Sequence, residues 1–152
     1  MNTKIWIDAD GCPVVKIAVG MATRYQVPVV IVCDTAHDFE KEKRDGVEVI
    51  TVSQGSDSAD YVLVNRIQPG DIAITQDYGL AAMCLSRRAY VLNQDGRAYN
   101  EDTIDAMLYS RYTAQKIRKS GGHVKGPKKR TMKQNRNFTF ALEAYLSSSC
   151  GR

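Results

Sequence analysis

Residues 4–33 read KIWIDADGCPVVKIAVGMATRYQVPVVIVC and predict a strand, a helix and a second strand in succession. Residues 4–8 are mostly apolar and end in an acid, which is typical of a short strand. Apolar residues then recur at helical spacing from Pro13, which suits a first helical position because proline has no N–H, to about Tyr25. Residues 27–33 are rich in β-branched side chains, as in a strand buried on both faces. This stretch therefore predicts one β-α-β unit.

The same alternation continues along the chain. Turn-forming residues separate further apolar runs. These runs predict strands at 47–52, 71–75 and 89–92. They also predict three helices, one that ends near residue 67 and two that span 80–87 and 101–117. Residues 118–137 lack apolar periodicity and are expected to form a loop before a last helix at 138–146. We therefore predict an α/β fold with a mostly parallel central sheet and helices on both faces. The length of 152 residues suits a single domain over 1–152, with a basic loop and C-terminal helix at about 118–146.

The charge of the chain is unevenly distributed. The formal net charge is +4, but residues 1–105 hold 10 Lys or Arg against 16 Asp or Glu, whereas residues 106–152 hold 11 against 1. Residues 107–142 contain ten basic residues and no acid. Such asymmetry is a cue for binding nucleic acid or another acidic surface.

Membrane-spanning and disulfide-stabilised classes are not favoured. The longest apolar run, residues 27–33, is far shorter than the roughly 20 residues that span a bilayer. The first ten residues reach two acids before a signal-peptide core could form. The four cysteines show no CxxC and no zinc-ligand spacing, so we expect free thiols in a reducing cytoplasm; they are Cys12, Cys33, Cys84 and Cys150.

Aspartates follow the predicted strands. The carboxyl ends of parallel strands meet at one edge of a sheet, where α/β proteins bind ligands. Gathered carboxylates repel one another unless a cation compensates, and hard oxygen ligands suit Mg²⁺ or Mn²⁺. We therefore predict a metal site at this edge, formed by Asp8, Asp10, Asp57, Asp60 and Asp77.

Structural roles are the alternative for some of these acids. Asp57 and Asp77 are equally suited to cap a helix. Asp34, after the second strand, is expected to stabilise a loop. Asp8 and Asp60 have less reason to occupy their positions for structure alone, so a metal or catalytic role is favoured for them.

Four motifs resemble the bacterial YaiI/YqxD family over nearly the whole chain, to about Leu146. They occur in the order of that family, and they read DADGCPV at 8–14, QGSDSADY at 54–61, GDIAITQDYGLA at 70–81 and KGPKKRT at 125–131. The family is uncharacterised, so the resemblance implies a fold more directly than an activity.

The YaiI/YqxD family in turn resembles a distant branch of the PIN-like nucleases, which implies a three-layer α/β/α PIN-like domain. The acids of PIN domains then correspond to Asp8 or Asp10, to Asp60 with help from Asp57, and to Asp77 in the Thr-x-Asp turn. Another PIN acid, in the helix after strand two, has no convincing match within residues 34–45. The basic extension beyond residue 117 also lies outside a minimal PIN domain.

The basic segment is the candidate substrate-binding region. Cationic loops bind phosphates without reading sequence, and the candidate residues are Lys125, Lys128, Lys129 and Arg130. These cations could fold back onto the acidic edge, by which we mean the carboxyl ends of the strands that carry the aspartates. There they would either hold a phosphate or form an internal electrostatic clamp. The third alternative is that they form a solvated surface. The flanking Tyr109, Tyr112, Phe138 and Phe140 are expected to face the core rather than to stack on bases.

The sequence predicts a metal-dependent nuclease, most simply one acting on RNA, with Asp8, Asp10, Asp60 and Asp77 as its catalytic carboxylates. A non-catalytic nucleic-acid-binding module is the alternative, in which the basic loop binds and the acids are structural. A small-molecule phosphatase would use the same carboxylates.

Overall fold

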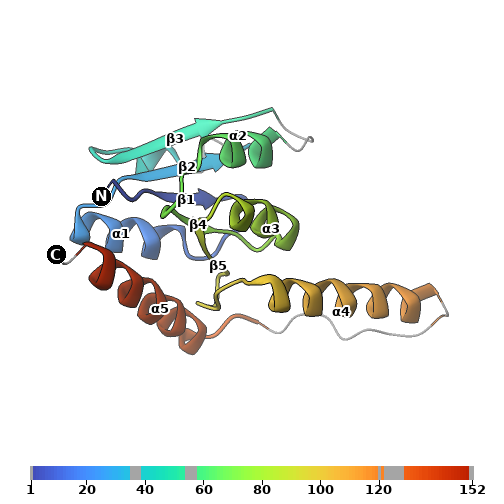
Figure 1. The fold of residues 1–152 in the computed structure, drawn as a ribbon. Coiled ribbons are helices and arrows are strands. Elements are labelled where there is room, and N and C mark those ends of the chain that lie inside the picture. The colour runs from blue at the N-terminus through green and yellow to red at the C-terminus, as the bar shows by residue number, and fades with distance from the viewer. Residues whose placement is uncertain (1, 35–38, 54–57, 120, 122–128, 151–152) are drawn as a thin grey trace.

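A computed structural model of the chain describes residues 2–34, 39–53, 58–119, 121 and 129–150 (Figure 1). Strands and helices alternate from β1 to β5, and two further helices follow. The strands are β1 (Ile5–Asp8), β2 (Val29–Cys33), β3 (Val47–Thr51), β4 (Ile72–Ile74) and β5 (Tyr90–Leu92). The helices are α1 (Val15–Tyr25), α2 (Ser58–Arg66), α3 (Tyr78–Ser86), α4 (Glu101–Lys119) and α5 (Met132–Cys150), with the 3-10 turn η2 (Glu40–Glu42) before β3.

The five strands form one sheet in the order β3-β2-β1-β4-β5, and every neighbouring pair is parallel. The chain first builds outward from β1 to β3 and then crosses back to place β4 on the other side of β1. The predicted parallel α/β sheet is therefore confirmed. The topology reverses between β1 and β4, which is the position where open α/β sheets bind ligands at their carboxyl ends.

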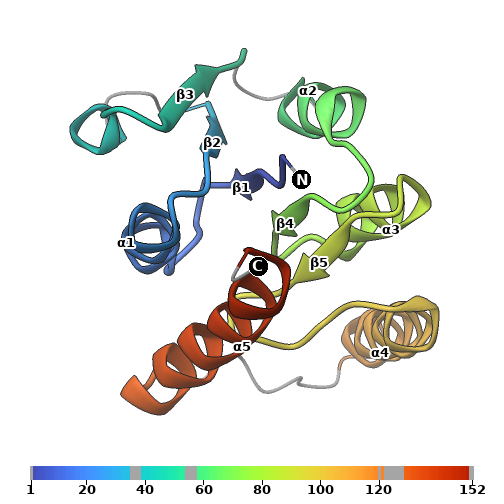
Figure 2. The same cartoon turned by 60° about the vertical axis from the view of Figure 1, so that its left-hand side comes forward.

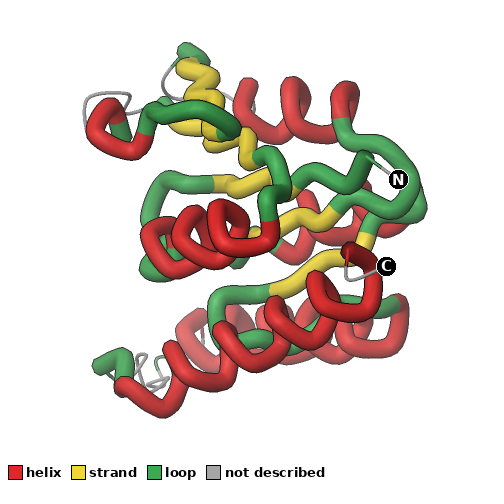
Figure 3. Tube along the Cα trace, turned by 90° about the vertical axis from the view of Figure 1, so that its left-hand side faces the viewer, coloured by secondary structure: helices red, strands yellow, loops and turns green. Residues whose placement is uncertain are grey.

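Helices cover both faces of this sheet, as the three-layer α/β/α expectation requires (Figures 2 and 3). On one face, Ile5 and Ile7 of β1 lie in a buried cluster with α1 and α5, including Phe138. On the other face, Trp6 of β1 lies in a second cluster with α2, α3 and the start of α4. Alternate residues of a strand point to opposite faces, so Asp8 points to the same side as Trp6.

Three predicted helix boundaries are wrong. Helix α1 begins at Val15 rather than Pro13, because the backbone closes a turn from Cys12 N–H to Ala9 O at 2.9 Å before the helix can start. Helix α3 begins at Tyr78 rather than at residue 80, because Asp77 caps it.

Helix α5 begins at Met132, six residues before the predicted start at 138, so the expected loop over 118–137 is shorter than predicted. Thr131 Oγ1 accepts a hydrogen bond from Gln134 N–H at 3.3 Å, and Gln134 Oε1 accepts one from Thr131 N–H at 2.7 Å. This reciprocal pair is a capping box, the Thr-x-x-Gln start signal of a helix. Apolar periodicity does not reveal it, because the first turns of α5 are largely solvent-facing.

The aromatic side chains near the basic segment divide between core and solvent. Phe138 is fully buried, as expected, but Tyr109, Tyr112 and Phe140 are 72%, 62% and 79% exposed, so the expectation of a core position is wrong for these three. Tyr109 and Tyr112 belong to helix α4, which extends beyond the sheet (Figure 1). No helix in the described part of the chain is long and apolar enough to cross a membrane.

Candidate active site

The carboxyl ends of β1 and β4 place Asp8 beside Thr75. Ile7 of β1 is in register with Ile74 of β4, and each strand ends within one residue of that pair. Asp8 Oδ2 accepts a hydrogen bond of 2.7 Å from Thr75 Oγ1, and the same hydroxyl oxygen accepts one of 3.0 Å from Asp77 N–H. The buried Thr75 side chain therefore links Asp8 and Asp77, two of the acids predicted to form the metal site.

Asp77 has a structural role at the start of α3. Its Oδ1 accepts hydrogen bonds from Gly79 N–H at 2.8 Å and Leu80 N–H at 3.3 Å, which is the geometry of a helix N-cap. A Cβ at residue 79 would lie 3.1 Å from Asp77 Oδ1, so glycine leaves room for the cap. Asp77 Oδ2 accepts no hydrogen bond from the residues that the structure describes, and this oxygen remains available to a ligand.

Burial and the neighbouring charges shift the pKa of Asp8. Burial raises the pKa of the Asp8 carboxyl; the Thr75 hydrogen bond opposes this effect, while the charges of Asp77 and Asp10 add to it. Its Oδ1, like Asp77 Oδ2, accepts no hydrogen bond within the described residues. A nearby cation would favour the charged form of Asp8.

Asp10 joins the same edge from the turn after β1. Gly11, with a φ of 75°, turns the chain there, and Gln76 Nε2 donates a hydrogen bond of 2.7 Å to Gly11 O. Asp10 Oδ2 accepts one of 2.7 Å from Asp34 N–H. Partial burial and the Asp10 carboxylate raise the pKa of Asp34. The expected loop role of Asp34 fits the backbone contact, but its carboxyl also belongs to the acidic edge.

Asp60 lies on α2, half-buried, on the Asp8 side of the sheet. Both carboxylates act on the thiol of Cys84 in α3: burial, then Asp60 and Asp8, raise the pKa of Cys84 to about 12. The sequence-predicted Asp8, Asp10, Asp60 and Asp77 therefore gather at one edge of the sheet. Asp57 lies outside the described residues.

The chemistry of this donor set suits a hard divalent cation, although its described members form no closed cage for one. Within the described ranges, no group of three or more His, Cys, Asp or Glu side chains is close enough to hold a metal ion by itself. Mg²⁺ commonly keeps several waters and takes only one or two carboxylates together with substrate phosphate. Asp8 and Asp77, each with a carboxylate oxygen that accepts no hydrogen bond from the described residues, fit that mode of binding.

Arg130 contacts the turn after β5. Its Nη1 forms a 2.7 Å ion pair with Asp95 Oδ1, and its Nη2 donates a hydrogen bond of 2.6 Å to Gln94 O. Its Nε donates one of 2.8 Å to Asn135 Oδ1 on α5. A Cβ at Gly96 would lie 2.5 Å from Asn137 O, so this turn packs closely on α5. Arg130 thus makes the contacts of an internal clamp.

The same guanidinium lies within electrostatic reach of the acidic edge. Burial raises the pKa of the Cys12 thiol, with Asp8 adding to the rise and Arg130 opposing it. Lys129 is exposed. Lys125 and Lys128 lie outside the described residues. Cys12 and Cys84 are free thiols in the described part of the chain, as expected.

Sequence reasoning missed three residues of this region. Thr75 orients Asp8. Tyr99 donates a hydrogen bond of 3.1 Å to Thr75 O, and burial, with Asp77 and Asp95, raises the pKa of its hydroxyl to about 12. Asn93 is the first residue after β5 and is buried. Thr75 and Asn93 could have been found by the rule that selected the aspartates, since each directly follows a strand.

Comparison with known proteins identifies the family. The family described as "Uncharacterized BCR, YaiI/YqxD family" matches residues 6–148. The chain belongs to the YaiI/YqxD family. Its resemblance to that family, noted from four motifs, is therefore confirmed.

Curated bacterial relatives named "UPF0178 protein" match almost end to end. The relative from Exiguobacterium sibiricum is 49% identical over 95% of this chain and 96% of its own length. Those from Natranaerobius thermophilus and Clostridium acetobutylicum are 44% and 41% identical, each over 94% of this chain and 95% and 96% of their own lengths. No solved structure matches the chain. The YaiI/YqxD family carries no assigned activity, so function has to be argued from the site.

Proposed function

We propose that this YaiI/YqxD-family chain is a metal-dependent phosphodiesterase of PIN-like type that cleaves RNA. One observation carries the proposal: Asp8 lies at the topological switch point with a raised pKa, beside Asp77 and Asp10, and one of its oxygens accepts no hydrogen bond from the described residues. Clustered titratable groups with perturbed pKa values in this position are a mark of functional sites.

Asp8 and Asp77 would hold Mg²⁺ or Mn²⁺, with Asp10, Asp57 and Asp60 as the remaining candidate ligands. A divalent cation in such a site polarises the phosphodiester and lowers the pKa of a water molecule. The substrate phosphate and water would complete the ligand set, because the described protein residues do not.

The chain's own residues hold the carboxylates in place. The Thr75 hydroxyl orients Asp8, and the start of α3 fixes Asp77 through two backbone N–H groups. The Asp34 N–H holds Asp10. Because burial raises the pKa of Asp8, the charged form that binds a cation increases as the pH rises through that pKa. Activity should therefore increase with pH on its acid limb.

The basic C-terminal part would bind the phosphate backbone. Lys125, Lys128 and Lys129 are the candidate phosphate contacts. Arg130 is already paired with Asp95, so we assign it to placing the segment beside the acidic edge. Each phosphate that a cation neutralises adds to the salt dependence of binding.

The test is cleavage of labelled single-stranded RNA and DNA by the purified chain with Mg²⁺ or Mn²⁺. Asp8→Asn and Asp77→Asn should each lower the rate at least about 100-fold, the scale expected when a group that stabilises the transition state is lost. Asp45→Asn is the matched control, because Asp45 is exposed at the opposite edge of the sheet, two residues before β3. Metal-replete wild-type protein that cleaves neither polymer would exclude the proposal.

A non-catalytic nucleic-acid-binding module is the second candidate. The exposed Tyr109, Tyr112 and Phe140 favour it, since aromatic side chains in a basic region can stack on bases. Filter binding across a salt series, with and without EDTA, separates the two functions. Binding that survives EDTA, weakens with salt and yields no product would favour the binding module.

A further inference from the structure

Asn93 directly follows β5 and lies in line with Asp8 and Thr75 at the carboxyl ends of β1 and β4. Ile7, Ile74 and Leu92 are in register across β1, β4 and β5, so the residues that follow them lie side by side at the carboxyl edge. Neighbouring strands lie about 4.8 Å apart, which puts Asn93 roughly 10 Å from Asp8. Asn93 therefore lies two strand positions from the proposed reacting centre, on the same edge.

Asn93 is mostly buried, but its amide nitrogen is accessible. Its Oδ1 accepts hydrogen bonds from Asp95 N–H at 2.8 Å and Arg97 N–H at 2.9 Å, which identifies the other end of the amide as the nitrogen. The residue is only 7% exposed, yet no described residue accepts a hydrogen bond from its Nδ2. No buried side-chain nitrogen or oxygen among the described residues lacks a hydrogen-bond partner, so the Asn93 Nδ2 donor reaches solvent and is open to a ligand.

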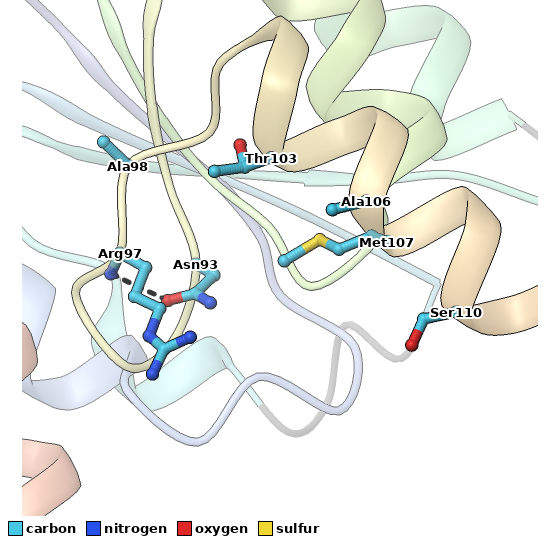
Figure 4. A pocket seen from close by; sticks show the side chains of 7 residues that line it. All are labelled: Asn93, Arg97, Ala98, Thr103, Ala106, Met107 and Ser110. Carbon is cyan, nitrogen blue, oxygen red and sulfur yellow. Dashed lines mark hydrogen bonds between the residues drawn. The ribbon is translucent and has the colours of Figure 1, made fainter.

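That donor faces a cavity of about 280 Å³ between the turn after β5 and the first half of α4 (Figure 4). Ala98, Ala106 and Met107 form its apolar walls, and the Ser110 hydroxyl lies at the far end. Arg97 lines the cavity as well, and its exposed guanidinium makes no ion pair or hydrogen bond within the described residues. The cavity thus combines apolar walls, an accessible N–H donor and a cation that no described residue pairs.

We propose that this cavity is a subsite for one nucleotide of the substrate. A nucleobase would lie between Ala98 and Met107 and present a hydrogen-bond acceptor to Asn93 Nδ2, while its phosphate pairs with Arg97. A ring with an acceptor and a nearby anion is the ligand that satisfies all three features of the cavity at once. The choice of a nucleotide rests on the proposed function, whereas the cavity and its donor do not.

The probe is adenosine 5′-monophosphate, titrated in EDTA and followed by calorimetry, with adenosine and ribose 5-phosphate as partial ligands. Asn93→Asp keeps the oxygen that accepts both backbone N–H groups and replaces the Nδ2 donor with an acceptor. It should weaken binding of the nucleotide about tenfold, as for a lost hydrogen bond. Arg97→Gln should weaken the nucleotide about tenfold and leave adenosine unchanged.

Arg87→Gln is the matched control, because Arg87 is an exposed arginine that caps α3 at the opposite edge of the sheet. It should bind as the wild type does. No saturable binding of the nucleotide to the wild type, or equal binding by wild type and Asn93→Asp, would overturn the subsite. Ribose 5-phosphate binding as tightly as the whole nucleotide would overturn the base position.

The Asp8→Asn variant separates this inference from the proposed function. It should bind the nucleotide like the wild type, since Asp8 does not line the cavity. Nucleotide binding without any RNA cleavage by the wild type would reject the nuclease alone. Cleavage by a wild type that binds no nucleotide in the cavity would reject the subsite alone.

Discussion

Asp71 and Asp8 lie at opposite ends of the parallel strands, and their carboxylates differ in how many hydrogen bonds they accept. Asp71 lies just before β4, is 2% exposed and accepts hydrogen bonds from Lys4 N–H, Trp6 Nε1 and Gln68 N–H at 2.9–3.0 Å. Asp8, at the end of β1, has a single side-chain donor, Thr75, and other carboxylates for neighbours. A carboxylate whose oxygens are all paired is structural, whereas one left underpaired among like charges suits a ligand.

The largest loss of stability is expected for a substitution of Asp71, at the amino ends of the strands. Asp71→Asn replaces one acceptor oxygen with an NH₂ group that faces a buried donor, so the free energy of unfolding should fall by about 3 kcal/mol. The midpoint of thermal unfolding should fall by roughly 6–12 °C. Thermal denaturation followed by circular dichroism measures this, with Asp45→Asn as the neutral control. A loss below about 1 kcal/mol would contradict the structural role of Asp71.

The Asp-to-Asn substitution at Asp8, at the carboxyl ends of the strands, should instead raise the free energy of unfolding. Burial raises the pKa of Asp8 above its ordinary value of 3.8, so the folded state binds more protons than the unfolded state between these two values. Stability therefore falls as pH rises through that window, and the penalty is complete above it. Asp8→Asn removes the penalty and should raise the unfolding midpoint by about 1–3 °C at pH 7.

Two measurements sharpen this prediction for Asp8→Asn. Its advantage over the wild type should shrink as the pH is lowered through the pKa of Asp8, because the wild-type carboxyl then becomes neutral. Mn²⁺ should stabilise the wild type and leave the variant unchanged, since the variant lacks the proposed carboxylate ligand. An Asp8→Asn protein less stable than wild type at pH 7 would make Asp8 structural, like Asp71.

Thr75→Val probes the hydroxyl that links Asp8 to Asp77. The variant keeps the shape of the side chain but removes the donor to Asp8 Oδ2 and the acceptor for Asp77 N–H. Because the lost hydrogen bond lowers the pKa of Asp8 in the wild type, the acid limb of the cleavage profile should move to higher pH. Thr75→Ser should restore the profile, and a profile that does not move would show that Thr75 does not position Asp8.

The smallest effect on cleavage is expected at the start of α5. Thr131→Ala removes the capping box with Gln134 and should cost about 1 kcal/mol of stability. Cleavage should stay within about twofold of the wild type, because the cap does not touch the acidic residues. Denaturant unfolding and the RNA assay check both parts, and a large loss of cleavage would mean that α5 helps to build the site.

Local sequence pattern determined which elements form and where most of them lie. The period-2 and period-3.6 patterns in residues 4–33 depend only on neighbouring side chains, so β1, α1 and β2 could be predicted together with the acids that follow the strands. The capping box of α5 is present in the sequence as Thr131-x-x-Gln134, but it produces no apolar periodicity.

Only the tertiary structure decided which of these residues meet. Asp8 and Thr75 are 67 positions apart, and their contact depends on β4 pairing with β1 rather than extending the sheet beyond β3. The same pairing buries Asp71 against Trp6 and aligns Asn93 with the acidic edge. Strand order and register arise from long-range packing of apolar faces, which no short window of sequence encodes.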